Sequence, residues 1–336
     1  MVFAVQPPAR ASSFPSDRAF HSTMIVVQNP LSPPPGLAGA VVAIGNFDGV
    51  HRGHAAVIAC AQKLARKLGK PSAVLTFEPH PVDFFAGPGT VFRLTPEAER
   101  NRCLARLGLD GVVVMTFDSG VASLSAEDFV TEILIKRLGV CGAVVGYDFH
   151  FGKARGGSPE FLAQAGARHG FAVEIVPQVV ADADGHPEAI HSQAARKALE
   201  AGDVARAAIL LGHAWFAVGE VIHGEKLGRT LGFPTANVRL DPSCRLRHGI
   251  YAVRLAFDGV THGGVASFGR RPTVTDTGAP LLETFVFDFE GDLYGKTVEV
   301  TFVGWIRGEE KFPSLDALVA EMNRDKEKAR AMLAGG

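Results

Sequence analysis

The strongest constraint in this sequence is a change of hydrophobic pattern along the chain. From about residue 40 to residue 176, short apolar runs alternate with amphipathic stretches, whereas beyond about residue 215 strand-like runs follow one another without a long helix between them. Alternating strands and helices are typical of a parallel sheet in a doubly wound α/β domain. A series of strands separated by Gly, Pro and Asp indicates a small antiparallel barrel or sandwich. The pattern therefore predicts two different folds in one chain.

The predicted elements follow these two patterns. In the first part we expect strands at 40–44, 73–77, 112–117, 143–147 and 173–176 and helices at 54–68, 96–107, 126–138 and 159–168. A polar stretch at 181–187 is interpreted as a loop, and two short helices are expected at 194–201 and 204–211. Strand-like runs then lie at 215–222, 249–257, 261–268, 282–289 and 297–303, before a closing helix at 314–332 that packs on the barrel.

The length agrees with two domains, because 336 residues exceed what most single hydrophobic cores contain. We place the domains at 24–190 and 213–333, joined by a helical connector at 191–212. Residues 1–23 lack the apolar core of a secretory signal and are interpreted as a disordered extension. Met24 is an alternative start, and a transit peptide is the alternative interpretation of the extension.

Composition excludes several classes of partner. With 47% apolar and 21% charged residues and a net charge of −1, the chain has no overall electrostatic reason to bind nucleic acid. It has no apolar run of the roughly 20 residues that a membrane span needs. Its four cysteines are far apart in sequence and lack the spacing of a zinc site or a disulfide framework. We therefore expect a cytoplasmic protein that binds neither nucleic acid nor membrane.

A dense motif follows the first strand of the α/β part. Residues 45–54 read Gly-Asn-Phe-Asp-Gly-Val-His-Arg-Gly-His and lead directly into the first predicted helix. Glycines let the backbone approach a ligand, and N–H groups at a helix N-terminus favour anions. His51 and His54 are three residues apart, so both can face the same phosphates during nucleotidyl transfer. The alternative is a tight turn in which one histidine caps the helix and the other is exposed.

This motif resembles the HxGH signature of the nucleotidyltransferase superfamily. Together with Thr-Phe-Glu-Pro-His-Pro at 76–81 and Gly-Tyr-Asp-Phe-His-Phe-Gly at 146–152, it is similar to the FAD synthetase half of bacterial bifunctional riboflavin kinase/FAD synthetases. The resemblance implies that His51 and His54 hold the ATP phosphates, and that Asp148, Phe149 and the Gly-rich stretch up to Gly157 border the flavin and the nucleotide. The loop residues assigned with them to the phosphate site are Gly45, Phe47, Asp48 and Gly53.

One segment departs from the family pattern. The family's Ser-Ser-Thr-x-Ile-Arg motif is replaced here by His-Ser-Gln-Ala-Ala-Arg at 191–196. Ser192 and Arg196 retain one hydroxyl and the guanidinium for contacts with ATP phosphates. Loss of one transition-state hydrogen-bond donor can cost on the order of a hundredfold in rate. We therefore expect the replacements to lower the rate of adenylylation, unless His191 or Gln193 donates the missing hydrogen bonds to the phosphates.

A second dense motif lies in the strand-rich part. Gly224 is followed by Gly-Arg-Thr-Leu-Gly-Phe-Pro-Thr-Ala-Asn at 228–237. Gly224, Gly228 and Gly232 would let a loop wrap phosphates, while Thr235 and Asn237 supply the hard oxygen ligands that suit Mg²⁺. The chain contains neither a Walker A motif nor the protein-kinase motifs. A hairpin in which glycine and proline only form turns is the alternative.

The full string is similar to the riboflavin kinase signature, and further matches follow at 249–252, 267–273, 282–284 and 292–295. The resemblance implies a small β-barrel, with Thr235 and Asn237 binding Mg²⁺ and ATP phosphates and Glu283 acting as general base on the riboflavin 5′-hydroxyl. Glu283 is the acid in a strongly apolar strand, where burial without a purpose would be costly. The alternative is a solvent-facing position on an edge strand.

The resemblance covers residues from about 24 to 330 and implies two activities, riboflavin to FMN and FMN to FAD, both with ATP. Two alternatives remain open at this point. In the first, the replacements at 191–196 disable adenylylation, and the chain has riboflavin kinase activity only. In the second, the chain is a non-catalytic flavin-binding or regulatory protein, which would not need Thr235, Asn237 and Glu283 together.

Overall fold

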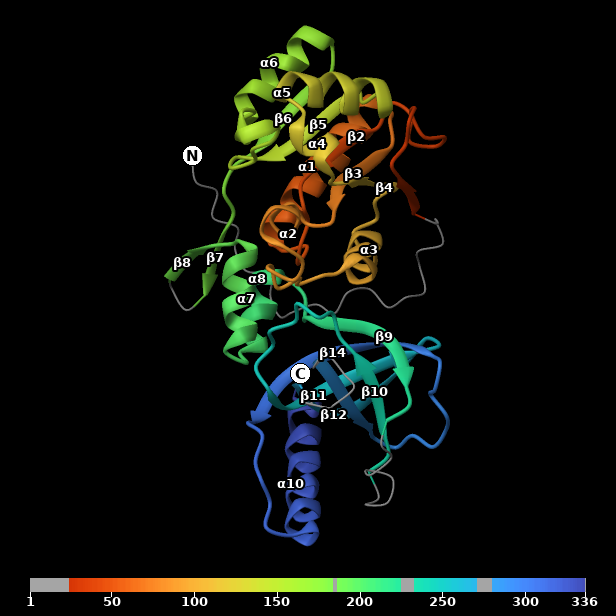
Figure 1. The fold of residues 1–336 in the computed structure, drawn as a ribbon, viewed down its shortest axis with the longest axis vertical. Coiled ribbons are helices and arrows are strands. Elements are labelled where there is room, and N and C mark those ends of the chain that lie inside the picture. Colours follow the sequence, from red (N-terminus) through yellow and green to blue (C-terminus); the bar gives the residue numbers. More distant parts are fainter. Residues whose placement is uncertain (1–23, 184–185, 225–232, 271–279, 336) are drawn as a thin grey trace. The chain divides into compact units, whose positions relative to one another are not determined.

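The structure, a computed structural model, describes residues 24–183, 186–224, 233–270 and 280–335 (Figure 1). The predicted extension at 1–23 lies outside the described residues. The chain divides into two compact units. The first takes the described residues of Met1–Val91 and Arg100–His191, and the second takes those of Phe92–Glu99 and Ser192–Gly336.

The first unit is built on a parallel sheet of six strands. Their order is β1-β4-β3-β2-β5-β6, and each neighbouring pair is parallel. The strands are β1 (Ile25–Gln28), β2 (Val41–Ile44), β3 (Ser72–Glu78), β4 (Gly111–Thr116), β5 (Gly142–Gly146) and β6 (Ala172–Val176). The chain runs outward from β2 to β3 and β4 on one side and to β5 and β6 on the other. The predicted doubly wound fold is confirmed, and its switch point lies between β2 and β5.

Helices connect these strands and cover both faces of the sheet. They are α1 (Arg52–Leu68), α2 (Pro81–Ala86), α3 (Glu97–Arg106), α4 (Ser119–Ser123), α5 (Ala126–Asp128), η1 (Phe129–Arg137), η2 (Lys153–Arg155) and α6 (Pro159–His169). Val42 and Ile44 share a core cluster with residues of η1 and α6, whereas Val41 points to the opposite face near Leu64 of α1. All four residues of β2 are buried, as expected for a central parallel strand.

One local prediction for this part of the chain was wrong, and one predicted helix is present but of a different type. The polar stretch at 181–187, predicted as a loop, contributes to the antiparallel strands β7 (Val180–Ala183) and β8 (His186–Ala189). Strand pairing uses main-chain hydrogen bonds, so a polar sequence without apolar alternation can still form it. The single helix predicted at 126–138 is a short α5 followed by a π-helix, η1, which ends with Leu138 N–H donating to Ile133 O at 3.1 Å.

The second unit contains a closed antiparallel barrel with strand order β10-β13-β12-β11-β14-β9. The strands are β9 (Phe216–Ile222), β10 (Thr235–Arg239), β11 (Gly249–Phe257), β12 (Val260–Arg270), β13 (Pro280–Val286) and β14 (Thr297–Arg307). Helices α7 (Ser192–Glu200), α8 (Val204–Leu211) and α10 (Leu315–Ala334) complete the unit. The barrel prediction is confirmed, although β10 was not predicted. No helix among the described residues is both long enough and apolar enough to cross a membrane.

Residues Phe92–Glu99 belong to the second unit although they come from the first half of the sequence. Phe92 and Leu94 are fully buried in the core cluster that includes α7, α8 and the barrel strands. Trp215 Nε1 donates to Leu94 O at 2.8 Å, and the Val218 backbone N–H donates to Glu99 Oε1 at 2.8 Å. The barrel unit therefore needs this distant segment to complete its core.

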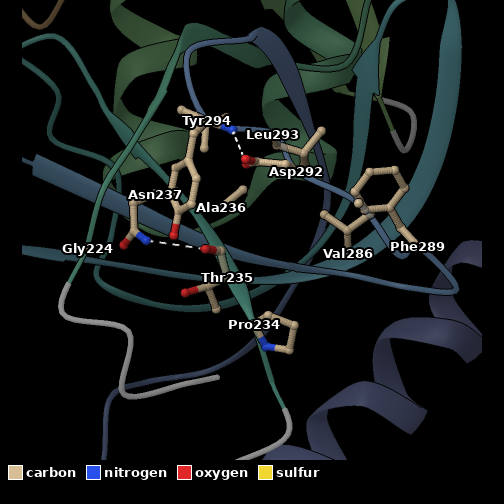
Figure 2. A pocket seen from close by; sticks show the side chains of 12 residues that line it. Gly224, Pro234, Thr235, Ala236, Asn237, Val286, Phe289, Asp292, Leu293 and Tyr294 are labelled. Atoms are coloured by element: carbon tan, nitrogen blue, oxygen red, sulfur yellow. Dashed lines mark hydrogen bonds between the residues drawn. The ribbon is translucent and has the colours of Figure 1, made fainter. Parts of the chain in front are cut away.

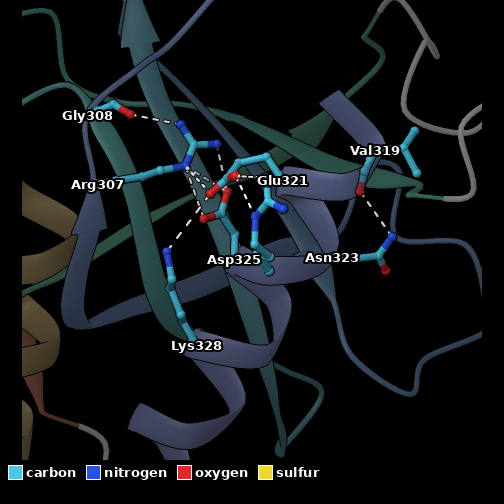
Figure 3. A network of polar contacts seen from close by, with 8 residues as sticks. Arg307, Gly308, Val319, Glu321, Asn323, Asp325 and Lys328 are labelled. Carbon is cyan, nitrogen blue, oxygen red and sulfur yellow. Dashed lines mark hydrogen bonds and ion pairs between the residues drawn. The ribbon is translucent and has the colours of Figure 1, made fainter. Parts of the chain in front are cut away.

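Helix α10 is fastened to the barrel by a charged network (Figure 3). Arg307 at the end of β14 donates from Nε and Nη2 to Asp325, with distances between 2.7 and 3.0 Å. Asp325 is only 2% exposed. Burial alone would lower the pKa of Arg307, but the hydrogen bonds and charge of Asp325 outweigh it and raise that pKa. Arg307 therefore stays protonated, and its hydrogen bonds to Asp325 hold α10 against the strands.

Replacing Asp325 with alanine should destabilise the barrel unit by about 3 kcal/mol, because it leaves the largely buried Arg307 without its main counter-ion. Chemical denaturation followed by fluorescence measures the change. Lys328→Ala is the matched control, since its Nζ lies 3.9 Å from Glu321 and the side chain is half exposed. The control should cost about 0.5 kcal/mol or less. Equal losses in both variants would contradict a structural role for the Arg307–Asp325 pair.

Candidate functional sites

The histidine motif forms a tight loop between β2 and α1, at the carboxyl end of the central strand. Phe47, Gly49 and Val50 have φ angles of +50°, +88° and +39°. The left-handed region is unfavourable for a bulky residue and especially for a β-branched one. Such strain is concentrated at functional sites. The loop conformation therefore supports a binding role beyond a simple connection.

His51 and His54 lie together at the start of α1. Their rings stack with centroids 3.6 Å apart and an interplanar angle of 14°. His51 is the N-cap of α1, and its Nδ1 accepts a hydrogen bond from the His54 backbone N–H at 3.2 Å. The capping alternative is thus correct for His51, but His54 does not point away from it. In neutral His51 the proton must then be on Nε2, which makes that atom a donor.

Other loop residues explain the close packing of this motif. A Cβ atom at Gly53 would lie 3.1 Å from Cε1 and Nδ1 of His51, so a side chain there would press on the ring. The same position lies 3.8 Å from Ile190 O, just before the segment with Ser192. Asp48 and Phe47 are 2% and 1% exposed. A Cβ atom at Gly45 would lie 3.4 Å from the Phe47 ring, which is an ordinary contact distance.

The loop after β5 lies next to the histidine loop, because β2 and β5 are neighbouring strands and form the switch point of the sheet. It carries Asp148, which is exposed, and Phe149, which is half-buried and stacks on Phe151 with centroids 5.4 Å apart. A Cβ atom at Gly157 would lie 2.7 Å from the Phe151 ring, so a side chain there would have to displace that ring. The structure therefore brings two predicted site segments to one edge of the sheet.

Sequence reasoning missed an exposed aromatic group near this edge. Phe85 on α2 is 70% exposed and packs on Phe84 and Phe117, with ring centroids 5.1 and 5.9 Å apart. Tyr147, after β5, is 48% exposed, and desolvation together with Asp148 raises its pKa. Exposed aromatic rings can stack on a planar ligand. Two adjacent phenylalanines after a buried strand were the available signal.

Ser192 and Arg196 lie on α7, which belongs to the second unit. Arg196 Nε donates to Phe92 O at 2.8 Å, so its guanidinium helps to hold the Phe92–Glu99 segment. Ala195 is fully buried in the same core. The histidine loop belongs to the other unit, and the approach of Ser192 and Arg196 to it remains a prediction.

In the barrel, Asn237 on β10 is the direct register partner of Glu283 on β13. Ala236 and Val238 are buried in the barrel core, as are Leu282 and Val286. Because side chains alternate along a strand, Asn237 and Glu283 share the outer face, with Cβ atoms about 5 Å apart. Thr235 is two residues from Asn237 on the same face. The three residues predicted for kinase chemistry therefore gather at one place, on a closed barrel with no edge strand.

The two polar atoms of the Asn237 carboxamide differ in their partners among the described residues. Nδ2 donates to Thr235 O at 3.3 Å, whereas Oδ1 is buried and has no hydrogen-bond partner among the described residues. A Cβ atom at Gly224 would lie 2.6 Å from Nδ2 and 2.9 Å from Oδ1 of Asn237. A buried, unsatisfied side-chain oxygen, on a strand that also carries Thr235 and pairs with the strand of Glu283, fits a hard cation such as Mg²⁺.

Gly224, Thr235 and Asn237, but not Glu283, line a pocket that is open to solvent and holds about 660 Å³ of space (Figure 2). Its walls combine the polar Thr235, Asn237 and Asp292 with apolar and aromatic side chains, including Val286, Phe289 and Tyr294. Tyr294 also packs against His223, with ring centroids 3.9 Å apart. The combination suits a ligand with a flat apolar part and a charged part. Gly228 and Gly232, predicted to wrap phosphates, lie outside the described residues.

Gly224→Ala should lower FMN formation by about 10- to 100-fold, because the added methyl group displaces the Asn237 amide and misplaces the ligands it holds. FAD formation from supplied FMN should be unchanged. Gly308→Ala is the matched control, since a Cβ atom there meets nothing within 4 Å. Chromatography of the flavin products measures both rates. A normal rate of FMN formation in Gly224→Ala would show that this close approach is not needed.

Comparison with known proteins decides the family. A family model for FAD synthetase matches residues 34–189, and one for riboflavin kinase matches residues 211–333. The chain is 43% identical over 296 residues to the bifunctional riboflavin kinase/FMN adenylyltransferase of Pseudomonas fluorescens, covering 88% of this chain and 94% of the relative. The chain belongs to the bifunctional riboflavin kinase/FMN adenylyltransferase family.

Other relatives agree with this membership. The Escherichia coli K12 riboflavin kinase/FMN adenylyltransferase is 41% identical over 87% of this chain and 92% of its own length. A crystal structure from Streptococcus pneumoniae, described as a macrolide-efflux protein, is 32% identical and superposes with a TM-score of 0.78. It covers 91% of this chain and 99% of its own. The family membership therefore extends over both units of the chain.

Proposed function

We propose that this chain makes FMN from riboflavin and then FAD from FMN, using ATP in both steps. The observation that carries the kinase half is the register pairing of Asn237 with Glu283 beside the pocket. The observation that carries the adenylyltransferase half is the stacked His51–His54 pair at the N-terminus of α1. Both units belong to transferase families of this kind.

In the kinase step, the riboflavin 5′-oxygen attacks the γ-phosphorus of ATP and ADP leaves. We assign Glu283 to accept the hydroxyl proton, so that the attacking oxygen gains negative character as the bond forms. Thr235 and Asn237 hold the phosphate end of ATP, and the apolar wall with Val286 and Phe289 takes the adenine. We assign Gly224, Gly228 and Gly232 to contacts with the phosphates, as the sequence predicts. The protein thereby supplies position and a base, which are its main tasks in phosphoryl transfer.

Mg²⁺ would be held here by Asn237 Oδ1 together with Thr235 Oγ1. When bound it would neutralise phosphate charge. The buried, unsatisfied Asn237 oxygen is the feature of this chain that supports the assignment.

In the adenylyltransferase step, a phosphate oxygen of FMN attacks the α-phosphorus of ATP and pyrophosphate leaves. His51 and His54 donate hydrogen bonds to the phosphates, and the N–H groups at the start of α1 add positive potential. Gly45, Phe47, Asp48 and Gly53 shape this loop. We assign Asp148 and Phe149, after β5, to the border of the flavin, and the exposed Phe85 ring to its flat face. Ser192 and Arg196 would complete the contacts to ATP.

A second candidate is a riboflavin kinase alone. It is favoured by the replacement of the hydroxyl residues at 191–196 and by the use of Arg196 to hold Phe92 O. We further propose a cytoplasmic location, where riboflavin and ATP are available.

Steady-state turnover tests whether the chain is an enzyme at all. With riboflavin and ATP in large molar excess over protein, we expect many molecules of phosphorylated flavin per protein molecule. Binding of one riboflavin per chain without phosphorylated product would instead identify a non-catalytic flavin-binding protein and would overturn the proposal.

A further inference from the structure

His80, in the loop after β3, connects helix α2 to the histidine loop. It is 8% exposed, and both ring nitrogens have neighbours. Nδ1 accepts a hydrogen bond from the Val82 backbone N–H at 3.2 Å and so caps the N-terminus of α2. Nε2 lies 3.3 Å from Nδ2 of Asn46. Asn46 is the second residue of the predicted phosphate motif at 45–54.

The contact with Val82 fixes the tautomer of His80. A backbone N–H can only donate, so Nδ1 must be unprotonated. The proton of the imidazole is then on Nε2, which faces the Asn46 amide as a donor. Two N–H groups cannot bond to each other, so the contact of Nε2 with Nδ2 requires the Asn46 amide to rotate by 180°, which brings Oδ1 to Nε2 as the acceptor. The amide is therefore oriented with its oxygen on His80 and its two N–H groups turned away from His80.

Asn46 is held a second time through its main chain. Thr76 Oγ1, fully buried in β3, donates to Asn46 O at 3.1 Å. Thr76 and His80 thus fix the backbone and the side chain of one residue from the neighbouring strand. Asn46 follows the carboxyl end of β2, where ligands of doubly wound sheets bind. Its side chain is half-buried, which leaves it within reach of a ligand.

We infer that His80 is a positioning residue for adenylyl transfer: its tautomer orients Asn46 so that the Asn46 amide N–H groups donate to a phosphoryl oxygen. This inference rests on the proposed adenylyltransferase activity. The phosphoryl oxygen belongs either to ATP or to FMN, since both substrates have phosphoryl oxygens that accept hydrogen bonds. A donor fixed before the substrate arrives stabilises charge that develops in the transition state without reorganisation.

Two substitutions separate the two contacts of His80. In His80→Asn, the side-chain oxygen takes the place of Nδ1 and caps α2, but nothing reaches Asn46. In His80→Gln, the amide N–H reaches the place of Nε2 and restores the donor to Asn46, while the cap is lost. We expect kcat for FAD formation to fall about 10-fold in His80→Asn and to stay within about 3-fold of wild type in His80→Gln.

A double-mutant cycle with Asn46→Ala tests whether His80 acts through Asn46. Asn46→Ala should lower kcat about 10-fold or more, and His80→Asn should cause no further loss in that background. Michaelis constants for ATP and for FMN, measured separately, show which phosphate is contacted. Riboflavin phosphorylation by the same samples reports whether the variants are intact. The inference would be overturned if the losses in kcat of the two single variants added in the double variant, or if His80→Asn formed FAD at the normal rate. It would also be overturned if His80→Asn and His80→Gln lost FAD formation and thermal stability to the same extent.

The tautomer provides a readout that does not depend on activity. In protein labelled with ¹⁵N-histidine, the resonances absent from His80→Asn identify His80 among the 12 histidines. We expect a protonated Nε2 and an unprotonated Nδ1 near neutral pH. A protonated Nδ1 would overturn the orientation of Asn46. If wild type formed no FAD while the expected tautomer was observed, the proposed activity would fail and the orientation would stand.

Discussion

Glu283→Gln should abolish FMN formation and leave adenylylation of supplied FMN intact. Glutamine has nearly the same shape and can still donate and accept hydrogen bonds beside Asn237, but it cannot take the proton of the riboflavin hydroxyl. Removing a positioned general base costs about 10²- to 10⁴-fold in rate. Flavin products should be separated by chromatography after incubation with riboflavin and ATP, and in parallel with FMN and ATP.

Glu327→Gln is the matched control for this substitution. Glu327 is exposed on α10, in the same unit as Glu283 but away from the β10–β13 strand pair, and both activities should remain normal. If Glu283→Gln lowered both activities equally, two independent sites would be contradicted.

The second large effect is expected at the histidine pair. His54→Ala should lower FAD formation from FMN by about 100-fold or more, because it removes a donor to the ATP phosphates and the ring that stacks on His51. Riboflavin phosphorylation should be unchanged, since Glu283, Asn237 and Thr235 lie in the other unit. Initial rates with FMN and with riboflavin measure the two effects in one preparation.

His51 needs a different substitution, because its ring also caps α1. Asparagine at position 51 keeps an accepting oxygen at the N-cap and removes the imidazole. His51→Asn should therefore lose FAD formation while thermal stability stays close to wild type. If FAD formation survived in both His51→Asn and His54→Ala, the histidine loop would not be the adenylyl-transfer site.

Much of the fold could be predicted because its signals are local. The buried strands β2 to β5 are short apolar runs, and α1, α3 and α6 follow them with helical periodicity. The edge strand β1 was missed because its residues are partly exposed. Strand β10 was missed because Thr235, Asn237 and Arg239 place polar side chains on its outer face, so the segment looked like a loop. Residues 92–99 carry no sequence signal of packing on the barrel, because that packing is a long-range contact.

The candidate sites were predicted residue by residue, but their geometry was not. The pairing of Asn237 with Glu283 depends on the register of two strands that are far apart in the sequence. The spacing of His51 and His54 indicated a shared face, whereas the capping bond and the ring stacking required coordinates. His80 lies in a motif that the sequence identifies, but no role could be predicted for it. Its contact with Asn46 joins two loops that are far apart in the sequence. The altered segment at 191–196 was identified from sequence, and its effect on adenylylation is still a prediction.

The most direct test uses purified protein in two incubations with Mg²⁺, one with riboflavin and ATP and one with FMN and ATP, and resolves the flavins by chromatography. We expect FAD in both incubations. FMN accumulating without FAD would contradict this expectation and leave a riboflavin kinase alone, with adenylylation disabled by the replacements at His191–Arg196.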